Sequence, residues 1–262
     1  MSQEKVNLKH HQRVWRSVVQ QLPPREWPRF LSQLYFPQNS SGKTSLPKET
    51  AFHPKKLKGS SVSIRRGTTD IEILLDLLAF ERYMPEEFDG SEKTILDLGA
   101  NIGVTTAHFA VGFPQSKVIG VELEKGNFDL AEKNTRFAKD RARVLHGAVW
   151  SFSGVVPFGG VKEDAYAVSP SGASSSKVQS FTVEELMREH HLGTVDYVKM
   201  DIEGAEYQVF LEGDPTWLQK VKSMMIEIHS DEHLTPIMRV LTEFNFKVRR
   251  SDKHWCALWA KK

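Results

Sequence analysis

The sequence has only one cysteine, Cys256, among its 262 residues. A single cysteine excludes an intrachain disulfide and a zinc site based on cysteines, and the apolar neighbours of Cys256 predict a small, buried hydrophobic side chain. No apolar run reaches the roughly 18 residues that span a bilayer, and the N-terminus lacks the apolar segment of a secretory signal. We therefore expect a soluble, cytoplasmic protein with no transmembrane segment.

The overall composition is that of an ordinary globular protein, with 40% apolar and 26% charged residues. These values exclude a collagen-like, coiled-coil or wholly disordered chain. The charges are unevenly distributed, because residues 1–66 contain thirteen Lys and Arg but three acidic residues. Such a basic segment could bind nucleic acid, an anionic membrane surface or an acidic partner. The alternative is a solvated helix face without a specific partner.

Residues 1–60 are predicted to form a basic helical arm and a linker. Apolar residues recur at helical spacing before Pro23-Pro24 and again between Trp27 and Tyr35, which indicates two short amphipathic helices. Their apolar stripes need a partner surface, which could be the main domain, a second subunit of a homo-oligomer or an apolar part of a substrate. Residues 37–60 have too little hydrophobicity to fold alone and are predicted to be a mobile connector.

Residues 61–262 alternate between predicted strands and helices, which indicates an α/β domain. The predicted strands are residues 61–65, 94–98, 117–122, 142–147, 195–200, 222–228, 245–250 and 254–260, with helices beginning near Thr69, Gly103, Gly126, Val183, Gly204 and Asp231. Continuous apolar strands separated by helices favour a mostly parallel sheet covered on both faces, a three-layer sandwich. The last two strands are too close in sequence for a crossover helix, so the last strand must be antiparallel. Residues 169–176 are predicted to be a low-complexity loop.

The strand at 94–98 runs into the turn Gly99-Ala-Asn101-Ile-Gly103, directly before a helix. Glycines at this turn would let the backbone approach a ligand, and the helix N-terminus offers unpaired N–H groups. The Gly-x-Gly-x-x-Gly register of dinucleotide sites and the Gly-Lys-Ser/Thr of a P-loop are both absent. Asp97, just before Gly99, could accept a hydrogen bond from a cationic amino group of the ligand.

Glu122 ends the next strand about 20 residues after this turn, the position of an acid that binds the two hydroxyls of a ribose. A carboxylate suits a cis-diol because it accepts two hydrogen bonds side by side. After the third strand, the small residues Ala148 and Val149 could admit an adenine or be ordinary strand residues. A ribose acid without a phosphate-binding register predicts S-adenosylmethionine as cofactor; the alternative is a generic α/β sheet with incidental glycines.

Four segments together resemble the FkbM family of S-adenosylmethionine-dependent methyltransferases. They are Asp97-x-Gly-Ala-Asn-Ile-Gly103, Glu122 with Gly126-Asn127-Phe128, Val195-Asp-Tyr-Val-Lys-Met-Asp-Ile-Glu-Gly-Ala-Glu206, and Met225-Ile-Glu-Ile-His229. The resemblance covers residues 64–260 and implies a class I methyltransferase (Rossmann-like) fold with a seven-stranded sheet, here over residues 61–262. It also implies O-methylation of hydroxyls on sugars, glycolipids or polyketide-derived natural products.

Polar residues follow the fourth and fifth strands of the predicted sheet, at the carboxyl edge where open parallel sheets bind ligands. Asp201 and His229 are candidate bases for a hydroxyl proton, and Glu203 is a candidate to hold the acceptor hydroxyl. The same three residues could instead bind Mg²⁺ and polarise the acceptor oxygen. Structural roles also remain open: Asp201 and Glu203 could cap a helix, and backbone groups could satisfy His229. Lys199 could pair with one of the acids.

The predicted function is methyl transfer from S-adenosylmethionine to a hydroxyl of a sugar, glycolipid or natural-product small molecule. The alternatives are N-methylation of a small molecule or protein, and a non-catalytic module that binds the cofactor. The sequence has Asp201-Ile-Glu-Gly where enzymes that methylate nucleobase amines have Asn/Asp-Pro-Pro-Tyr/Phe. We therefore expect no nucleic-acid partner.

Overall fold

The structure is a computed structural model that describes residues 3–35, 48–84, 87–160, 166–168 and 176–262. The chain divides into two compact units, unit 1 (residues 1–84) and unit 2 (residues 85–262). Most of the predicted low-complexity loop, residues 169–175, lies outside the described residues.

Unit 1 contains both predicted amphipathic helices. Its elements are α1 (Gln3–Gln21), a 3-10 turn (Pro24–Glu26), α2 (Trp27–Tyr35), β1 (Glu49–Phe52), a 3-10 turn (Lys55–Leu57), β2 (Val62–Arg65), α3 (Asp70–Leu75) and a π-helical turn (Asp76–Phe80). The stripe residues Val18, Leu22 and Phe30 are fully buried, and the rings of Phe30 and Phe52 lie 5.8 Å apart. The apolar stripes therefore pack within unit 1.

The predicted mobile connector is wrong for the residues that follow Lys48. Strand β1 pairs antiparallel with β2, from Glu49 opposite Arg65 to Phe52 opposite Val62. This pairing joins residues after 61 to the N-terminal segment, so the compact unit ends at Met84 and not at residue 60. Residues 36–47 of the connector lie outside the described residues.

Unit 2 is built on a seven-stranded sheet with the strand order β12-β13-β11-β10-β3-β4-β5. The strands are β3 (Thr94–Leu98), β4 (Lys117–Glu122), β5 (Ala142–His146), β10 (Val195–Met200), β11 (Val221–Glu227), β12 (Lys247–Arg250) and β13 (Ala257–Lys261). All neighbouring pairs are parallel except those with β13. The predicted mostly parallel sheet with an antiparallel last strand is confirmed.

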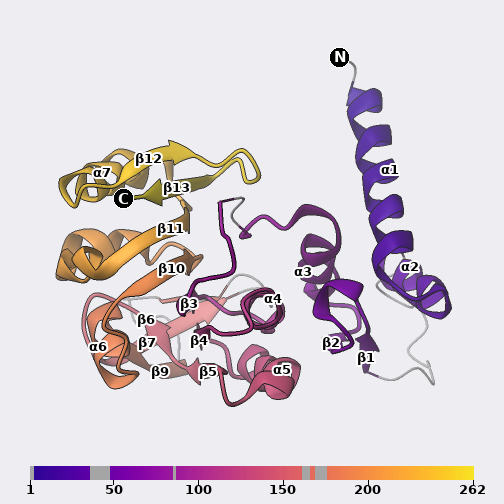
Figure 1. Cartoon of the computed structure of the whole chain (residues 1–262), viewed down its shortest axis with the longest axis horizontal. Coiled ribbons are helices and arrows are strands. Elements are labelled where there is room, and N and C mark those ends of the chain that lie inside the picture. The colour runs from indigo at the N-terminus through magenta and orange to yellow at the C-terminus, as the bar shows by residue number, and fades with distance from the viewer. Residues whose placement is uncertain (1–2, 36–47, 85–86, 161–165, 169–175) are drawn as a thin grey trace. The chain divides into compact units, whose positions relative to one another are not determined.

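Helical segments cover both faces of this sheet. They are α4 (Val104–Gly112), α5 (Lys125–Thr135), the 3-10 turn Arg136–Ala138, α6 (Val183–Glu189), the π-helical turn Gln208–Glu212, the 3-10 helix Pro215–Lys220 and α7 (Asp231–Glu243). Connections through α4 and α5 run along the sheet from β3 toward β5, whereas the β10–β11 connection runs the opposite way. Because such crossovers are right-handed, they cover opposite faces, and Figure 1 shows α4 and α5 apart from α6 and α7. The three-layer prediction is confirmed.

The sequence does not predict a second, four-stranded sheet, with the order β6-β9-β7-β8. Its strands are β6 (Ala148–Val149), β7 (Gly154–Gly160), β8 (Tyr166–Val168) and β9 (Ser176–Phe181). Ala148 and Val149 therefore leave the main sheet after β5, and both side chains are buried.

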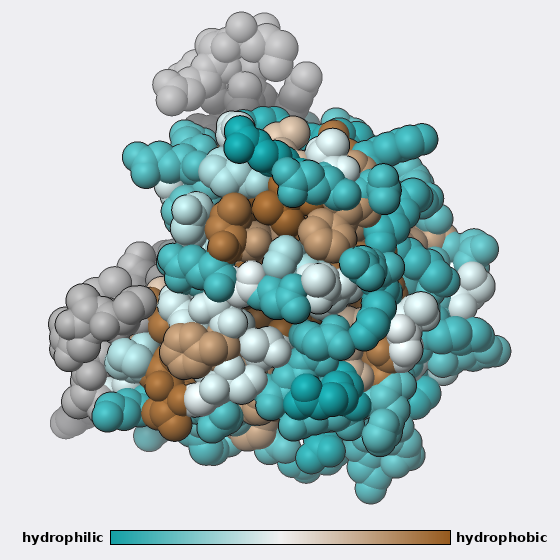
Figure 2. Space-filling model, turned by 90° about the vertical axis from the view of Figure 1, so that its left-hand side faces the viewer, coloured by the Kyte–Doolittle hydropathy of each residue, from teal (hydrophilic) through white to brown (hydrophobic). Residues whose placement is uncertain are grey.

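The apolar faces of the main sheet form the core of unit 2, around residues such as Leu96, Val198 and Met224. The face shown in Figure 2 is mainly hydrophilic, with hydrophobic residues in patches among hydrophilic ones. Among the residues that the structure describes, no helix is long and apolar enough to cross a membrane.

The order of the strands reverses direction at β3. The next strand in the chain, β4, pairs with one edge of β3, and β10 pairs with its other edge. The carboxyl ends of β3 and β10 therefore form the topological switch point, where open α/β sheets bind ligands.

Candidate active site

Close approaches within the protein shape the turn after β3. Gly99 has φ +83°, and a Cβ there would lie 1.7 Å from the carbonyl oxygen of Asp201. Gly103 has φ +76°, and a Cβ there would lie 2.7 Å from the Cα of Ala131 in α5. Neighbouring backbone requires glycine at both positions, and the binding of a cofactor by Gly99 and Gly103 stays a prediction.

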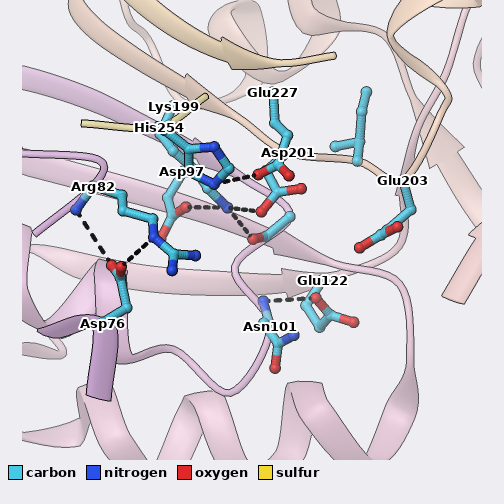
Figure 3. A network of polar contacts seen from close by, with 12 residues as sticks. Asp76, Arg82, Asp97, Asn101, Glu122, Lys199, Asp201, Glu203, Glu227 and His254 are labelled. Carbon is cyan, nitrogen blue, oxygen red and sulfur yellow. Dashed lines mark hydrogen bonds and ion pairs between the residues drawn. The ribbon is translucent and has the colours of Figure 1, made fainter. Parts of the chain in front are cut away.

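Glu122, at the end of β4, is held by two backbone N–H groups. Its Oε2 accepts the N–H of Asn101 at 2.7 Å (Figure 3), and its Oε1 accepts the N–H of Glu124 at 2.8 Å. Burial raises the pKa of Glu122 to about 7, although these hydrogen bonds act to lower it. Because each carboxylate oxygen has two lone pairs, Glu122 can still accept hydrogen bonds from ligand hydroxyls.

Buried Lys199 links β3 and β10. Its Nζ lies 3.4 Å from Asp97 and 3.6 Å from Asp201, and it donates to the carbonyl of Gly99 (Figure 3). Asp97 is fully buried and also accepts the Thr106 hydroxyl at 2.6 Å. Burial raises the pKa of Asp97. Burial also acts to lower the pKa of Lys199, but the charges of Asp201 and Asp97 outweigh it, so the pKa of Lys199 is raised. Asp97 thus meets Lys199 in the structure, and its contact with a ligand amino group stays a prediction.

His229, just after β11, lies among three carboxylates. Its Nδ1 is 3.0 Å from Glu206, and its Nε2 is 3.4 Å from Glu203 and 3.5 Å from Asp201. Burial lowers the pKa of His229, but the hydrogen bond and charge of Glu206, with the charges of Asp201 and Glu203, raise it to about 9. A pKa above neutrality favours the protonated imidazole, which suits a residue that positions these acids, and the role of His229 as a base stays a prediction.

Glu203 belongs to a strained turn after β10. It has φ +54° and is followed by Gly204 with φ +93°. The left-handed conformation costs a glutamate roughly 1 kcal/mol or more, and such strain is often found at functional sites. Burial, followed by the charge of Asp201, raises the pKa of Glu203 to about 7. A carboxylate with a pKa near neutrality suits general base catalysis.

The predicted Mg²⁺ site at Asp201, Glu203 and His229 is not supported. His229 offers a nitrogen atom, and it already lies within ion-pair distance of Asp201 and Glu203. Mg²⁺ moreover prefers oxygen ligands.

Sequence reasoning missed a group of residues beside this cluster. Glu227 Oε2 lies 3.2 Å from Nε2 of His254, and the Cys256 thiol donates to Glu227 Oε1 at 3.2 Å. Cys256 is only partly buried and has polar neighbours, so its prediction as a buried hydrophobic side chain is wrong. The antiparallel register, which places Glu227 opposite Ala257, brings these residues together. No sequence motif indicates that register.

The strand order, the turn at the switch point and the acid at the end of β4 define a class I S-adenosylmethionine-dependent methyltransferase fold. A family model described as the methyltransferase FkbM domain matches residues 97–248. The chain belongs to the FkbM methyltransferase family.

Three relatives show how similar the chain is to known proteins. It is 26% identical over 165 residues to hexuronic acid methyltransferase AglP of Haloferax volcanii, covering 62% of this chain and 66% of AglP. It is 22% identical over 201 residues to methyltransferase sdnD of Sordaria araneosa, covering 63% of this chain and 78% of sdnD. The crystal structure of methyltransferase FkbM from Methylobacillus flagellatus superposes with a TM-score of 0.51 at 15% identity, over 91% of this chain. The match spans 59% of that crystallised chain.

Proposed function

We propose that the protein transfers the methyl group of S-adenosylmethionine to a hydroxyl oxygen of a sugar, glycolipid or other natural-product small molecule. The observation that carries this proposal is the position of Glu122 and of the acids Asp201 and Glu203. Glu122 ends β4, and Asp201 and Glu203 follow β10, on either side of β3 at one edge of the sheet. The name of AglP, a hexuronic acid methyltransferase, supports a sugar as acceptor.

In this proposal the carboxyl edge of β3, β4 and β5 binds the cofactor. Glu122 accepts the ribose hydroxyls, with Asn101 fixing one of its oxygens. Ala148 and Val149 border the adenine. Asp97 acts through Lys199, which holds the carbonyl of Gly99 and so fixes the turn to β10. When bound, S-adenosylmethionine supplies a sulfonium methyl group that an oxygen nucleophile can attack.

The acceptor hydroxyl must lose its proton during the transfer. Glu203 is the favoured base because its pKa of about 7 leaves much of it ionised at neutral pH. Asp201 is next to it and binds or deprotonates the same hydroxyl. Protonated His229 holds both carboxylates in place. Alignment of the hydroxyl with the methyl group provides the rest of the rate enhancement.

We expect Glu203→Gln and Asp201→Asn to lower kcat roughly 10²- to 10⁴-fold, because each removes a proton acceptor while preserving size. Affinity for S-adenosylmethionine, measured by calorimetry, should stay within a few-fold. Turnover is measured by mass spectrometry of glycoside mixtures incubated with trideuteromethyl-labelled cofactor.

The matched control for these variants is Glu132→Gln, which neutralises an exposed acid on α5 and should leave turnover unchanged. Full activity in both site variants would remove the catalytic assignment. Label on nitrogen instead of oxygen would overturn the proposed hydroxyl acceptor.

Cofactor binding should depend on pH through Glu122. Its pKa of about 7 means that the carboxylate takes up a proton as the pH falls, and a protonated group accepts the ribose diol poorly. The dissociation constant of S-adenosylmethionine should therefore rise below pH 7, by up to about tenfold per pH unit. Calorimetry from about pH 5.5 to about pH 8, a range that spans the pKa of Glu122, measures this slope.

Glu122→Gln should weaken binding and abolish the slope. 5′-Methylthioadenosine, which has the ribose and adenine but no amino-acid part, should show the same slope as S-adenosylmethionine. A slope found for S-adenosylmethionine but absent for 5′-methylthioadenosine would contradict the assignment of the ribose to Glu122.

A further inference from the structure

Three side chains with different ligand atoms meet at the end of β11. Glu227 is the last residue of β11, and His254 and Cys256 lie in the hairpin that leads into β13. Three distances are 3.2 Å: Cys256 Sγ to Glu227 Oε1, Cys256 Sγ to His254 Nδ1, and His254 Nε2 to Glu227 Oε2. Figure 3 shows the His254 ring against the Glu227 carboxylate. One ligand atom from each residue lies within 4.8 Å of the other two.

We propose that Glu227, His254 and Cys256 form a binding site for a divalent transition metal of the zinc type. Thiolate sulfur, imidazole nitrogen and carboxylate oxygen are the donors that zinc uses in proteins. They are a poor set for Mg²⁺, which prefers oxygen ligands. The single cysteine excludes a site based on several cysteines, but the structure supplies two other ligands beside it.

The geometry fits a metal with small adjustments of the side chains. Zinc bonds of about 2.0–2.3 Å in a tetrahedral arrangement place ligand atoms roughly 3.3–3.6 Å apart. The Sγ atom of Cys256 lies 3.2 Å from both Glu227 Oε1 and His254 Nδ1, close to this spacing. The third 3.2 Å contact is made by His254 Nε2, which an ion bound through Nδ1 would not use. The thiol must lose its proton when the metal binds, so one proton is released to solvent for each ion bound. Three protein ligands leave one tetrahedral position open for water or a ligand oxygen.

The backbone around these residues is well fixed, which favours a preformed site. The N–H of Ile228 donates to the carbonyl of Cys256 at 2.8 Å, and the N–H of Ser251 donates to the carbonyl of Ala257 at 2.8 Å. The side chain of Ser251 accepts the N–H of His254 at 3.2 Å. The His254 side chain is 5% exposed and that of Glu227 is 17% exposed, so solvent competes little for the ion.

The test is a titration of the full-length, chelator-treated protein with Co²⁺, followed by displacement with Zn²⁺. Tetrahedral Co²⁺ has visible absorption bands, and a bound thiolate adds a charge-transfer band in the near ultraviolet. Because Cys256 is the only cysteine in the chain, a charge-transfer band identifies it as a ligand. We expect this band with one Co²⁺ per chain, and its loss when Zn²⁺ is added.

Cys256→Ser should abolish the charge-transfer band, and Glu227→Gln and His254→Ala should each weaken Co²⁺ binding at least tenfold. His191→Ala removes an exposed histidine outside the cluster and should leave Co²⁺ binding unchanged.

Circular dichroism of the metal-free variants checks that they remain folded. If His254→Ala unfolds, Glu227→Gln takes its place in the test. Absence of the band in the wild-type protein would overturn the proposal, as would unchanged affinity in Glu227→Gln. The test measures metal binding alone and does not depend on the proposed methyl transfer.

Discussion

Gly99→Ala is expected to destabilise unit 2 by about 4 kcal/mol or more, or to prevent its folding. The new Cβ would lie 1.7 Å from the carbonyl oxygen of Asp201, a distance that no rotamer change can relieve. The Asp201 backbone cannot move away easily, because its N–H donates to the carbonyl of Leu98 at 2.9 Å. The left-handed φ of Gly99 adds about 1–3 kcal/mol of strain for alanine. Urea unfolding measures the loss.

Gly90→Ala is the matched control for this prediction. Gly90 has φ +85°, nearly the same as the φ +83° of Gly99, but a Cβ there would meet no atom within 4 Å. This variant should therefore show the backbone strain alone, about 1 kcal/mol. Similar losses in the two variants would mean that contact with Asp201 contributes little. The comparison separates conformational strain from steric overlap.

The sequence predicts the central strands well because their pattern is strong. Residues 94–98, 117–122 and 195–200 match β3, β4 and β10 residue for residue. Each strand is mostly apolar, and its place in the middle of the sheet requires such a pattern because both faces are covered.

The four-stranded sheet shows where such patterns fail. Strand β7, Gly154–Gly160, contains three glycines and Pro157, which are residues typical of turns. Strand β6 has only two residues. Nothing in these segments distinguishes a strand from a loop, since their pairing depends on partners distant in sequence.

The positions of the candidate site residues could be predicted from the order of the strands, but some of their contacts could not. Parallel strands place their carboxyl ends at one edge, so the proximity of Asp201, Glu203 and His229 follows from topology, and the structure confirms their contacts. The protonation of His229 depends on Glu206, whose side chain reaches back to it. The atoms that require Gly99 and Gly103 to be glycine belong to Asp201 and Ala131, which no local motif identifies.

Lys199→Met is expected to destabilise unit 2 by about 3–5 kcal/mol, because it leaves a buried carboxylate without its cation. Asp97 is fully buried and lies opposite Lys199 in the β3–β10 register. Methionine keeps most of the length of the lysine side chain, so the loss reflects charge more than packing. Burial raises the pKa of Asp97, and removal of Lys199 raises it further. The folded variant then binds a proton more tightly than the unfolded chain, so its stability should fall as the pH rises through that pKa.

A double-mutant cycle with Asp97→Asn separates the ion pair from other effects. Asparagine removes the charge and can still accept the Thr106 hydroxyl that Asp97 accepts at 2.6 Å. The double variant Asp97→Asn/Lys199→Met should therefore lose less stability than the sum of the two single losses, by about 1–3 kcal/mol. It should also lose the added pH dependence, because no buried carboxylate remains at position 97. Additive losses, measured by urea unfolding at two pH values, would mean that Lys199 stabilises the fold mainly through the Gly99 carbonyl and Asp201.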